Sequence, residues 1–282
     1  NEKELKIDHL NTILDDLKAK NAAVVESTIP VSNARISRNE ILYKENTGLC
    51  DVAMDVKTYI KSVFGATSPQ YKQISKLEFK KVKVKYSDVG KGRVIVLVHG
   101  FLCSHEVWTE LAKSLSKRFR VIAIDLPGHG ETPCIGYYHS MELLAQCIKA
   151  VLDKAKVRRY ILAGHSIGGY AVLAFAELFP ENVSGLCLLN SSSYADTEEK
   201  RKNRDRAIRL VKKEHKHYVT EVVASLFAPE LLPKLKNQVT KVKRLAEHIT
   251  KQSIINTLEG MKERKNRDLI LKFADYPILF II

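Results

Sequence analysis

The spacing of apolar residues changes near residue 77. Before that point, apolar positions recur at steps of three and four, which is typical of amphipathic helices. Two such runs occur, the first through Leu5, Leu10, Ile13, Leu14 and Leu17 and the second through Val52, Val56, Tyr59, Ile60 and Val63. We therefore expect residues 1–70 to form a helical hairpin or half of a bundle, whose second helix ends at Gly65.

After residue 77 the pattern is that of strands alternating with helices. Residues 77–92 alternate between apolar and polar side chains, which predicts a strand pair at a sheet edge that turns near Gly90 to Gly92. Continuous apolar runs then predict strands, and amphipathic segments between them predict helices. The strands are expected at 93–100, in the strand and loop of 120–130, at 158–166 and at 183–192, and the helices at 106–119, 140–155 and 168–180. This alternation predicts an α/β fold with a mostly parallel sheet flanked by helices on both faces, and with its site at the carboxyl ends of the strands.

Residues 195–270 interrupt this alternation with several predicted helices, including 202–227 and 253–273. Their apolar stripe should face a pocket or the core. It includes Ile208, Val211, Val222, Leu226 and Phe227. The apolar run that follows, in "DYPILFII" at 275–282, predicts one more strand.

A G-x-S-x-G motif lies where the strand of 158–166 meets the next helix. The motif runs from Gly164 through His165, Ser166 and Ile167 to Gly168. In this strand–turn–helix the serine is held in a strained conformation, and side chains at either glycine position would crowd the neighbouring backbone. The helix N-terminus beside the serine favours negative charge. The motif therefore makes Ser166 the candidate nucleophile.

Three segments in this order, "VHGF" at 98–101, "DLPGHGET" at 125–132 and "GHSIGG" at 164–169, make residues 77–282 resemble the α/β-hydrolase superfamily. The likeness is to its lidded, serine-nucleophile carboxylesterases of the pimeloyl-carrier methyl ester esterase type, with residues 195–270 as the helical lid. It implies a nucleophile elbow at Ser166 and an oxyanion hole formed by the main-chain N–H groups of Phe101 and Ile167. The remaining motif residues would support this site: His99, Gly100, Gly164, His165 and Gly168. Asp125 and His129 would have a structural role in their loop.

A serine nucleophile needs a base, and the base needs an orienting carboxylate. In the superfamily the acid and then the histidine follow the strand after the lid, which implies that both lie beyond Ile282. We therefore expect the hydrolase domain, 77–282, to be incomplete at its C-terminus, so that this fragment alone has little activity. Asp196 is an alternative acid, although either Asp196 or Thr197 suits the cap of the first lid helix. The lid histidines fit solvated helix faces better than a base: His215, His217 and His248.

These observations predict a serine hydrolase acting on a carboxylic ester or thioester of a small or carrier-bound acyl group through an acyl-serine intermediate. A hydrolase of carbon–carbon bonds, a lyase or peroxidase of the same superfamily, and a non-catalytic binding protein on the same scaffold remain alternatives. No cofactor is implied and no metal site is expected, because the five cysteines are scattered without C-x-x-C spacing. Reduced cysteines favour a cytoplasmic protein, and the apolar runs fall far below the roughly 18 residues of a membrane span.

The net charge of +14 is concentrated in the lid. Residues 197–272 hold 20 of the 46 Lys and Arg residues but 10 of the 32 Asp and Glu residues. Two interpretations stay open, namely solvated helix faces and attraction of an acidic substrate or partner, such as an acyl-carrier protein. Nucleic-acid binding is not expected, because no recognised motif or interleaved aromatic residues accompany the charge.

Overall fold

The computed structural model describes residues 49–69, 71–72, 83–136 and 138–282. The chain divides into two units, Asn1–Lys81 and Val82–Ile282. In the first unit, helix α2 (Leu49–Phe64) is the second of the two predicted helices. It ends as expected at Gly65, which has a φ of +83° and donates its N–H to the carbonyl of Lys61 at 3.0 Å. The other predicted helix, and with it the hairpin, lies outside the described residues.

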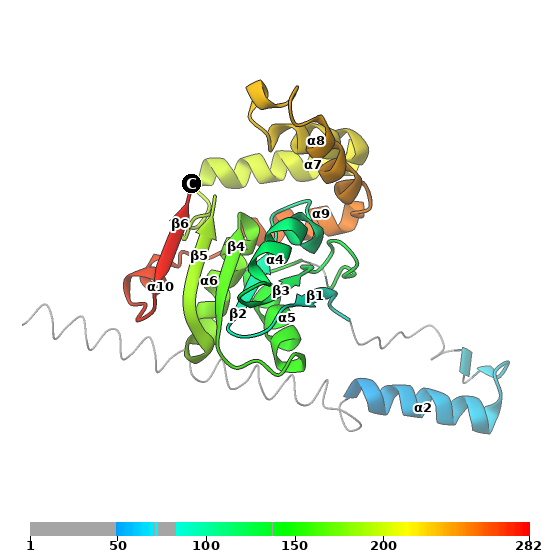
Figure 1. Ribbon diagram of the computed structural model, residues 1–282. Helices are drawn as coiled ribbons and strands as arrows, with labels where there is room; N and C mark the ends of the chain where they lie inside the picture. Colours follow the sequence, from blue (N-terminus) through cyan, green and yellow to red (C-terminus); the bar gives the residue numbers. More distant parts are fainter. Residues whose placement is uncertain (1–48, 70, 73–82, 137) are drawn as a thin grey trace, which may run out of the picture. The chain divides into compact units, whose positions relative to one another are not determined.

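The second unit is built on a six-stranded sheet (Figure 1). Its strands are β1 (Tyr86–Val89), β2 (Val94–Val98), β3 (Arg120–Ile124), β4 (Tyr160–His165), β5 (Val183–Leu189) and β6 (Ile278–Ile281). The order is β1-β3-β2-β4-β5-β6, with β1 antiparallel to β3 and every other pair parallel. The predicted mostly parallel sheet is confirmed.

The strands on either side of the turn at Gly90 to Gly92 do not pair with each other, so the predicted strand pair is wrong. Strands β1 and β2 flank that turn, but β3 lies between them in the sheet. The reason lies in their burial. Strand β2 is covered on both faces and suits the interior of the sheet, whereas β1 is half exposed and suits an edge. The first part of the predicted pair, at 77–82, lies outside the described residues.

Helices cover both faces of the sheet, and successive side chains of β2 point to opposite faces, each into a different hydrophobic core. Val94, Val96 and Val98 contribute to the larger core, which includes side chains of α5 and α6. Leu97, between them, contributes to a smaller core with Trp108 and α4. The elements of these layers are η1 (His105–Trp108), α4 (Thr109–Leu115), α5 (Met141–Lys154), α6 (Ile167–Leu178) and η2 (Pro180–Asn182). Burial on both faces explains why these strands are continuous apolar runs.

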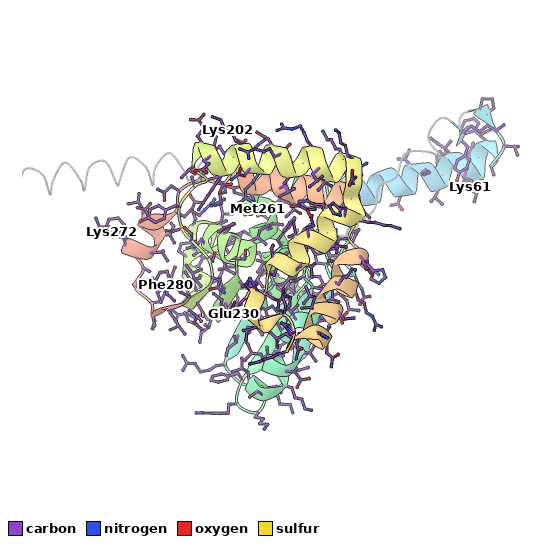
Figure 2. All side chains as sticks on the ribbon, turned by 90° about the horizontal axis from the view of Figure 1, so that it is seen from above. Lys61, Lys202, Glu230, Met261, Lys272 and Phe280 are labelled. Atoms are coloured by element: carbon purple, nitrogen blue, oxygen red, sulfur yellow. The ribbon has the colours of Figure 1, made fainter. Side chains whose placement is uncertain are left out.

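Residues 198–272 form the helical segment that we call the cap. It comprises α7 (Glu198–Ser225), η3 (Pro229–Leu231), α8 (Lys236–Glu247), α9 (Lys251–Lys262) and α10 (Asp268–Lys272). Helices α7 and α8 lie beyond the carboxyl ends of the strands (Figure 1), and α9, with Met261, runs beside α7 (Figure 2). Ile208 and Val211 are buried as expected, but Leu226 is 49% exposed and does not belong to the buried stripe.

The helix predicted over 253–273 forms as two helices, α9 and α10, because the chain leaves the helix between them. Two arginines in this break point inward to carboxylates on other elements. Arg264 binds Asp196, and Arg267 binds Glu142 on α5 and Glu177 on α6. The N–H of Arg267 also donates to the carbonyl of Ser193 at 2.8 Å. These tertiary contacts replace the helical hydrogen bonds that the local pattern favours.

Strand β6 confirms the strand predicted at 275–282 and forms an edge of the sheet. It pairs with β5 in parallel, from Leu186 opposite Ile278 to Leu189 opposite Ile281. Among the described residues no strand pairs with its other side. Phe280, at the rim of the molecule in Figure 2, is 52% exposed.

Candidate active site

Ser166 lies between the last residue of β4 and the first residue of α6, in a backbone conformation with φ 51° and ψ −116°. Its own peptide groups are held on several sides. The N–H donates to the carbonyl of Leu189 at 3.0 Å, and the carbonyl accepts from the hydroxyl of Ser191 at 2.8 Å and from the N–H of Gly169 at 2.9 Å. Its hydroxyl has no hydrogen-bond partner among the described residues. The strained turn therefore holds a serine whose peptide groups are bonded and whose hydroxyl no described group binds.

The glycines of the motif are required by close packing. A Cβ at Gly164 would lie 2.4 Å from the carbonyl of Gly168, and one at Gly168 would lie 2.4 Å from the carbonyl oxygen of Val98. A Cβ at Gly100 would lie 2.5 Å from Nδ1 of His165. Beta carbons are not found this close to other heavy atoms, so each position needs glycine for its β2, β4 and α6 neighbours to meet.

The main-chain N–H groups of Phe101 and Ile167 lie where the sequence predicts an oxyanion hole, after β2 and at the first residue of α6. Neither N–H donates a hydrogen bond within the described part of the chain. Leu102, next to Phe101, is fully buried with a φ of 59°, a strained residue that the sequence analysis missed. Free amides at a helix N-terminus and on a strained loop suit a developing negative charge.

His99 braces the loop after β2. Its Nδ1–H donates to the carbonyl of Gly100 at 2.8 Å, while its Nε2 accepts from the N–H of Leu126 at 3.0 Å. Burial lowers the pKa of His99 to about 4. Both ring nitrogens of this neutral imidazole are occupied, so it cannot take a proton from Ser166.

The two other histidines of the motifs also lack a bond to Ser166. The ring of His165 stands edge-on to Trp108 with centroids 6.4 Å apart, and burial lowers its pKa. His129 donates from Nδ1 to the carbonyl of Pro127, and burial lowers its pKa to about 3. Its buried Nε2 has no partner among the described residues. The ring centroid of His129 lies 6.2 Å from that of Phe101. The sequence did not indicate this unpaired nitrogen.

An unforeseen pair forms between Asp125 and His105. Oδ1 of Asp125 accepts from the N–H of His105 at 2.6 Å and from its Nδ1–H at 2.8 Å, and Oδ2 accepts from the N–H of Glu131. Burial by itself would raise the pKa of Asp125, but these hydrogen bonds lower it, and the bond to Asp125 raises the pKa of His105. The pair ties two loops together without a bond to Ser166. No periodicity marks it, because the partners are 20 residues apart.

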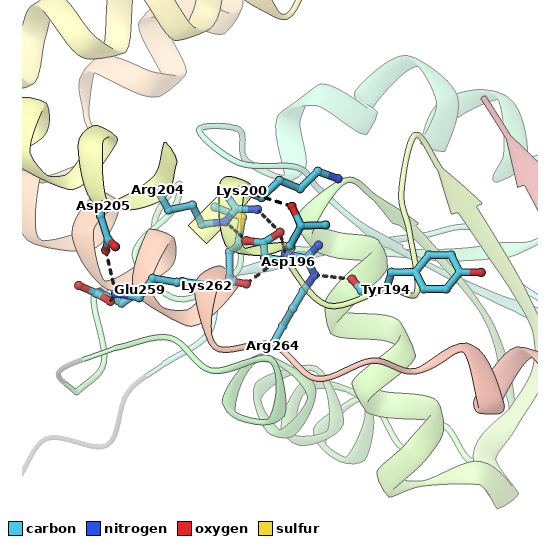
Figure 3. A network of polar contacts seen from close by, with 10 residues as sticks. Tyr194, Asp196, Lys200, Arg204, Asp205, Glu259, Lys262 and Arg264 are labelled. Atoms are coloured by element: carbon cyan, nitrogen blue, oxygen red, sulfur yellow. Dashed lines mark hydrogen bonds and ion pairs between the residues drawn. The ribbon is translucent and has the colours of Figure 1, made fainter. Parts of the chain in front are cut away.

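Asp196, the alternative acid, binds arginines instead of a histidine (Figure 3). It accepts from Nη1 of Arg264 at 2.5 Å and from Nε of Arg204. Burial alone would raise the pKa of Asp196, but the two arginines hold it below its usual range. The cap of α7 is Thr197, whose hydroxyl accepts from the N–H of Lys200 at 3.3 Å.

The histidines of the predicted lid contact residues other than Ser166 or are exposed. His215 contacts the carbonyl of Ile249 through Nε2 at 3.0 Å, and His217 lies 3.1 Å from Glu221. His248 is exposed at the end of α8. In the described part of the chain, no histidine or carboxylate therefore has a hydrogen bond to the hydroxyl of Ser166.

A cavity of about 390 Å³ lies between the cap and the loop after β2. Its lining comprises Phe101, Tyr170, Asp196, Lys200, Asn203, Arg204, Ala207, Tyr218, Val222 and Leu258. Ser166 is not part of this lining, but Tyr170 follows it by one turn on α6, and the N–H of Tyr170 donates to the carbonyl of Ser166 at 3.3 Å. Tyr170 therefore links the cavity lining to the helix that begins at the strained turn.

Three further findings concern the described residues. They contain no group of three or more His, Cys, Asp or Glu side chains that could hold a metal ion. None of the helices found in them has both the length and the apolar character that a membrane crossing requires. Cys103, Cys134, Cys147 and Cys187 are free thiols.

Comparison with known proteins gives the same architecture. The family described as the alpha/beta hydrolase fold matches residues 93–242. A thermophilic esterase from Thermogutta terrifontis superposes with a TM-score of 0.67 at 26% identity, over 71% of this chain and 74% of that one. The enol-lactonase from Burkholderia xenovorans LB400 superposes with a TM-score of 0.65 at 20% identity, over 71% of this chain and 77% of that one, and supports the fold alone.

Curated relatives match in sequence as well. The dihydrolipoyllysine-residue acetyltransferase component of the acetoin cleaving system of Pseudomonas putida is 29% identical over 67% of this chain and 51% of its own length. The pimeloyl-[acyl-carrier protein] methyl ester esterase of Pseudoalteromonas atlantica is 38% identical over 39% of this chain and 41% of its own length. This chain belongs to the α/β-hydrolase fold family. It spans about half or less of the length of these curated relatives.

Proposed function

We propose that this protein is a serine hydrolase that cleaves a carboxylic ester or thioester through an acyl-serine intermediate on Ser166. The observation behind the proposal is the conjunction of a strained, unbonded serine with two uncommitted main-chain N–H groups, those of Phe101 and Ile167. A nucleophile and the donors for an oxyanion are the two parts that acyl transfer requires at one place.

In the proposed reaction, Oγ of Ser166 attacks the acyl carbonyl carbon and gives its proton to a base. The carbonyl oxygen becomes an oxyanion that accepts from the N–H groups of Phe101 and Ile167. The alcohol or thiol leaves with the proton, and water then releases the acyl group by the same steps. We assign the base and its carboxylate to residues other than those described, because His99 and His165 have no bond to the serine.

The relatives include esterases as well as members of the alternative classes. One curated relative is a methyl ester esterase and one superposed structure is an esterase. Other relatives are a putative non-heme haloperoxidase of Mycobacterium phage D29 and a 2-hydroxy-6-oxononadienedioate/2-hydroxy-6-oxononatrienedioate hydrolase of Paraburkholderia phymatum. Hydrolysis of a carbon–carbon bond is therefore the second candidate.

Replacing Ser166 tests the proposal. The full-length protein should hydrolyse short p-nitrophenyl esters and should be labelled by a fluorophosphonate probe. In Ser166→Ala, both should be lost, with kcat falling by about 10³-fold or more because the nucleophile is gone. The exposed Ser114→Ala variant is the control and should behave as the unmodified protein.

Unchanged turnover or labelling in Ser166→Ala would overturn the assignment. A full-length protein that shows neither turnover nor labelling would favour a binding protein on this scaffold. Cleavage of carbon–carbon substrates in preference to esters would favour the second candidate.

A further inference from the structure

The cavity beneath the cap has two chemically different walls. Phe101, Tyr170 and Leu258 contribute apolar side chains from the loop after β2, from α6 and from α9. Lys200, Asn203 and Arg204 contribute polar side chains from the first turns of α7, with Asp196 beside them. The cavity therefore offers apolar contacts and charged groups to the same ligand.

The polar wall holds more positive than negative charge. Its single carboxylate, Asp196, is shared by Arg204 and by Arg264, which has a side chain only 4% exposed (Figure 3). Arg264 also donates from Nε to the carbonyl of Tyr194 and from Nη1 to that of Met261, and its guanidinium lies 4.1 Å from the ring centroid of Tyr170. Two guanidinium groups on one carboxylate leave one positive charge without a counter-charge, and the ammonium of Lys200 adds a second.

Hydrogen-bond donors on this wall are also uncommitted. Arg204 contacts Asp196 through Nε and Nη2, which leaves its Nη1 group without a partner among the described residues. The ammonium of Lys200 and the amide of Asn203 likewise have no partner in the described part of the chain. Lys262, in contrast, lies between Asp205 and Glu259 at 3.0 and 2.6 Å, so its charge is neutralised away from the cavity.

From this wall we infer that the cavity binds an anionic group at the far end of the acyl chain, with Lys200 and Arg204 as the residues that select it. A carboxylate or a phosphate would accept from their N–H groups and neutralise the excess charge, and the apolar wall would cover the chain between that group and the ester. The preferred substrates are then half-esters of dicarboxylic acids or their phosphate counterparts. This inference rests on the proposed ester hydrolysis.

A matched pair of substrates tests the inference in the full-length protein. Mono-p-nitrophenyl adipate and p-nitrophenyl hexanoate have the same chain length and differ in their end group. The adipate ester should have the higher kcat/KM, and Lys200→Met should lower this preference by about fivefold, as an exposed charge pair allows. Lys213→Met, which removes the same charge from an exposed position on α7 outside the cavity, should leave the preference unchanged.

Two more measurements sharpen the test. Arg204→Lys keeps a cation beside Asp196 but removes the planar fork, and it should also lower the preference. Inorganic phosphate and adipate, compared as competitive inhibitors, distinguish the two anions. If phosphate inhibits more strongly, the anion site is assigned to a phosphate group. If adipate inhibits more strongly, the site is assigned to a carboxylate.

Binding to Ser166→Ala, measured by calorimetry, separates this inference from the proposed function. If no ester is turned over but monomethyl adipate binds more tightly than methyl hexanoate and Lys200→Met removes the difference, the anion site stands and the hydrolase proposal fails. If esters are turned over without preference for the adipate ester, or if Lys213→Met changes the preference as much as Lys200→Met, the anion site is overturned.

Discussion

Ser166 adopts a backbone conformation that a serine rarely takes without support. Its φ of 51° is stabilised by hydrogen bonds from and to its own peptide groups and by glycines that let three elements meet around it. Gly164 and Gly168 belong to the motif in the sequence, whereas Ser191, whose hydroxyl donates to the carbonyl of Ser166, lies on a loop 25 residues later. Strain at this residue is thus maintained by distant parts of the chain.

Gly168→Ala should destabilise the protein by about 1–3 kcal/mol, because its Cβ would overlap the carbonyls of Val98 and His99 and force backbone to move. Denaturant unfolding measures the loss. Gly185→Ala on β5 is the control, since its Cβ would lie 3.3 Å from the side chain of Ile161, which can adjust. An equal loss of free energy of unfolding in the two variants would contradict this explanation of the glycine at 168.

At the scale of elements, the cap is fastened to the sheet layers by arginines in the break between α9 and α10. Arg267 contacts Glu142, in the first turn of α5, at 2.7 Å and Glu177, near the end of α6, at 2.8 Å. Its side chain is 3% exposed. A single buried side chain therefore ties the break in the cap to both α5 and α6, which explains why the chain leaves the helix there.

Arg267→Met should lower the free energy of unfolding by about 2 kcal/mol, because it leaves two partly buried carboxylates without their cation. This is below the value for a fully buried pair, since Glu142 and Glu177 keep contact with solvent. Lys265→Met provides the control. Its ammonium lies 3.9 Å from Glu142 on a side chain that is 67% exposed, so a loss under about 0.5 kcal/mol is expected. Equal losses would show that the position of the charge does not matter.

For the whole molecule, buried histidines connect the fold to pH. Burial lowers the pKa of His99 to about 4, of His129 to about 3 and of His139 to about 4, against 6.5 in the unfolded chain. The unfolded chain therefore binds more protons than the folded one as the pH falls below 6.5, and stability decreases. His105 acts in the opposite direction, because its hydrogen bond to Asp125 raises its pKa.

The free energy of unfolding should fall from pH 6 to pH 5 by up to about 4 kcal/mol, which is about 1.4 kcal/mol for each of three buried neutral histidines, less the opposing contribution of His105. Urea unfolding at a series of pH values measures this slope. His139→Gln should make this slope shallower by the equivalent of about one bound proton, whatever the variant's effect on stability at neutral pH. A stability that does not change over this range would show that these histidines are not held neutral.

The local elements follow from the sequence because they depend on near neighbours. Continuous apolar runs predict the strands of the hydrolase core, and the 3.6-residue period predicts its helices and the helix that ends at Gly65. The G-x-S-x-G spacing predicts the turn that strains Ser166, because a side chain at Gly164 would meet the backbone of Gly168 a few residues later. At Gly168 the crowding comes from Val98 and His99, at the end of β2. The positions of Phe101 and Ile167 follow from the same motifs, while their catalytic roles, like that of Ser166, stay predictions.

Contacts between distant residues were decided only by the tertiary structure. The Asp125–His105 pair joins residues 20 apart, the Asp196–Arg264 pair residues 68 apart and the Glu142–Arg267 pair residues 125 apart. Hydrophobic periodicity reports which face of an element is buried, but it does not report which charged groups meet across that face. The order of β1, β3 and β2, the break after α9 and the charged wall of the cavity therefore depend on packing. At the break the physical reason is burial, which forces Arg264 and Arg267 to find carboxylates wherever the fold supplies them.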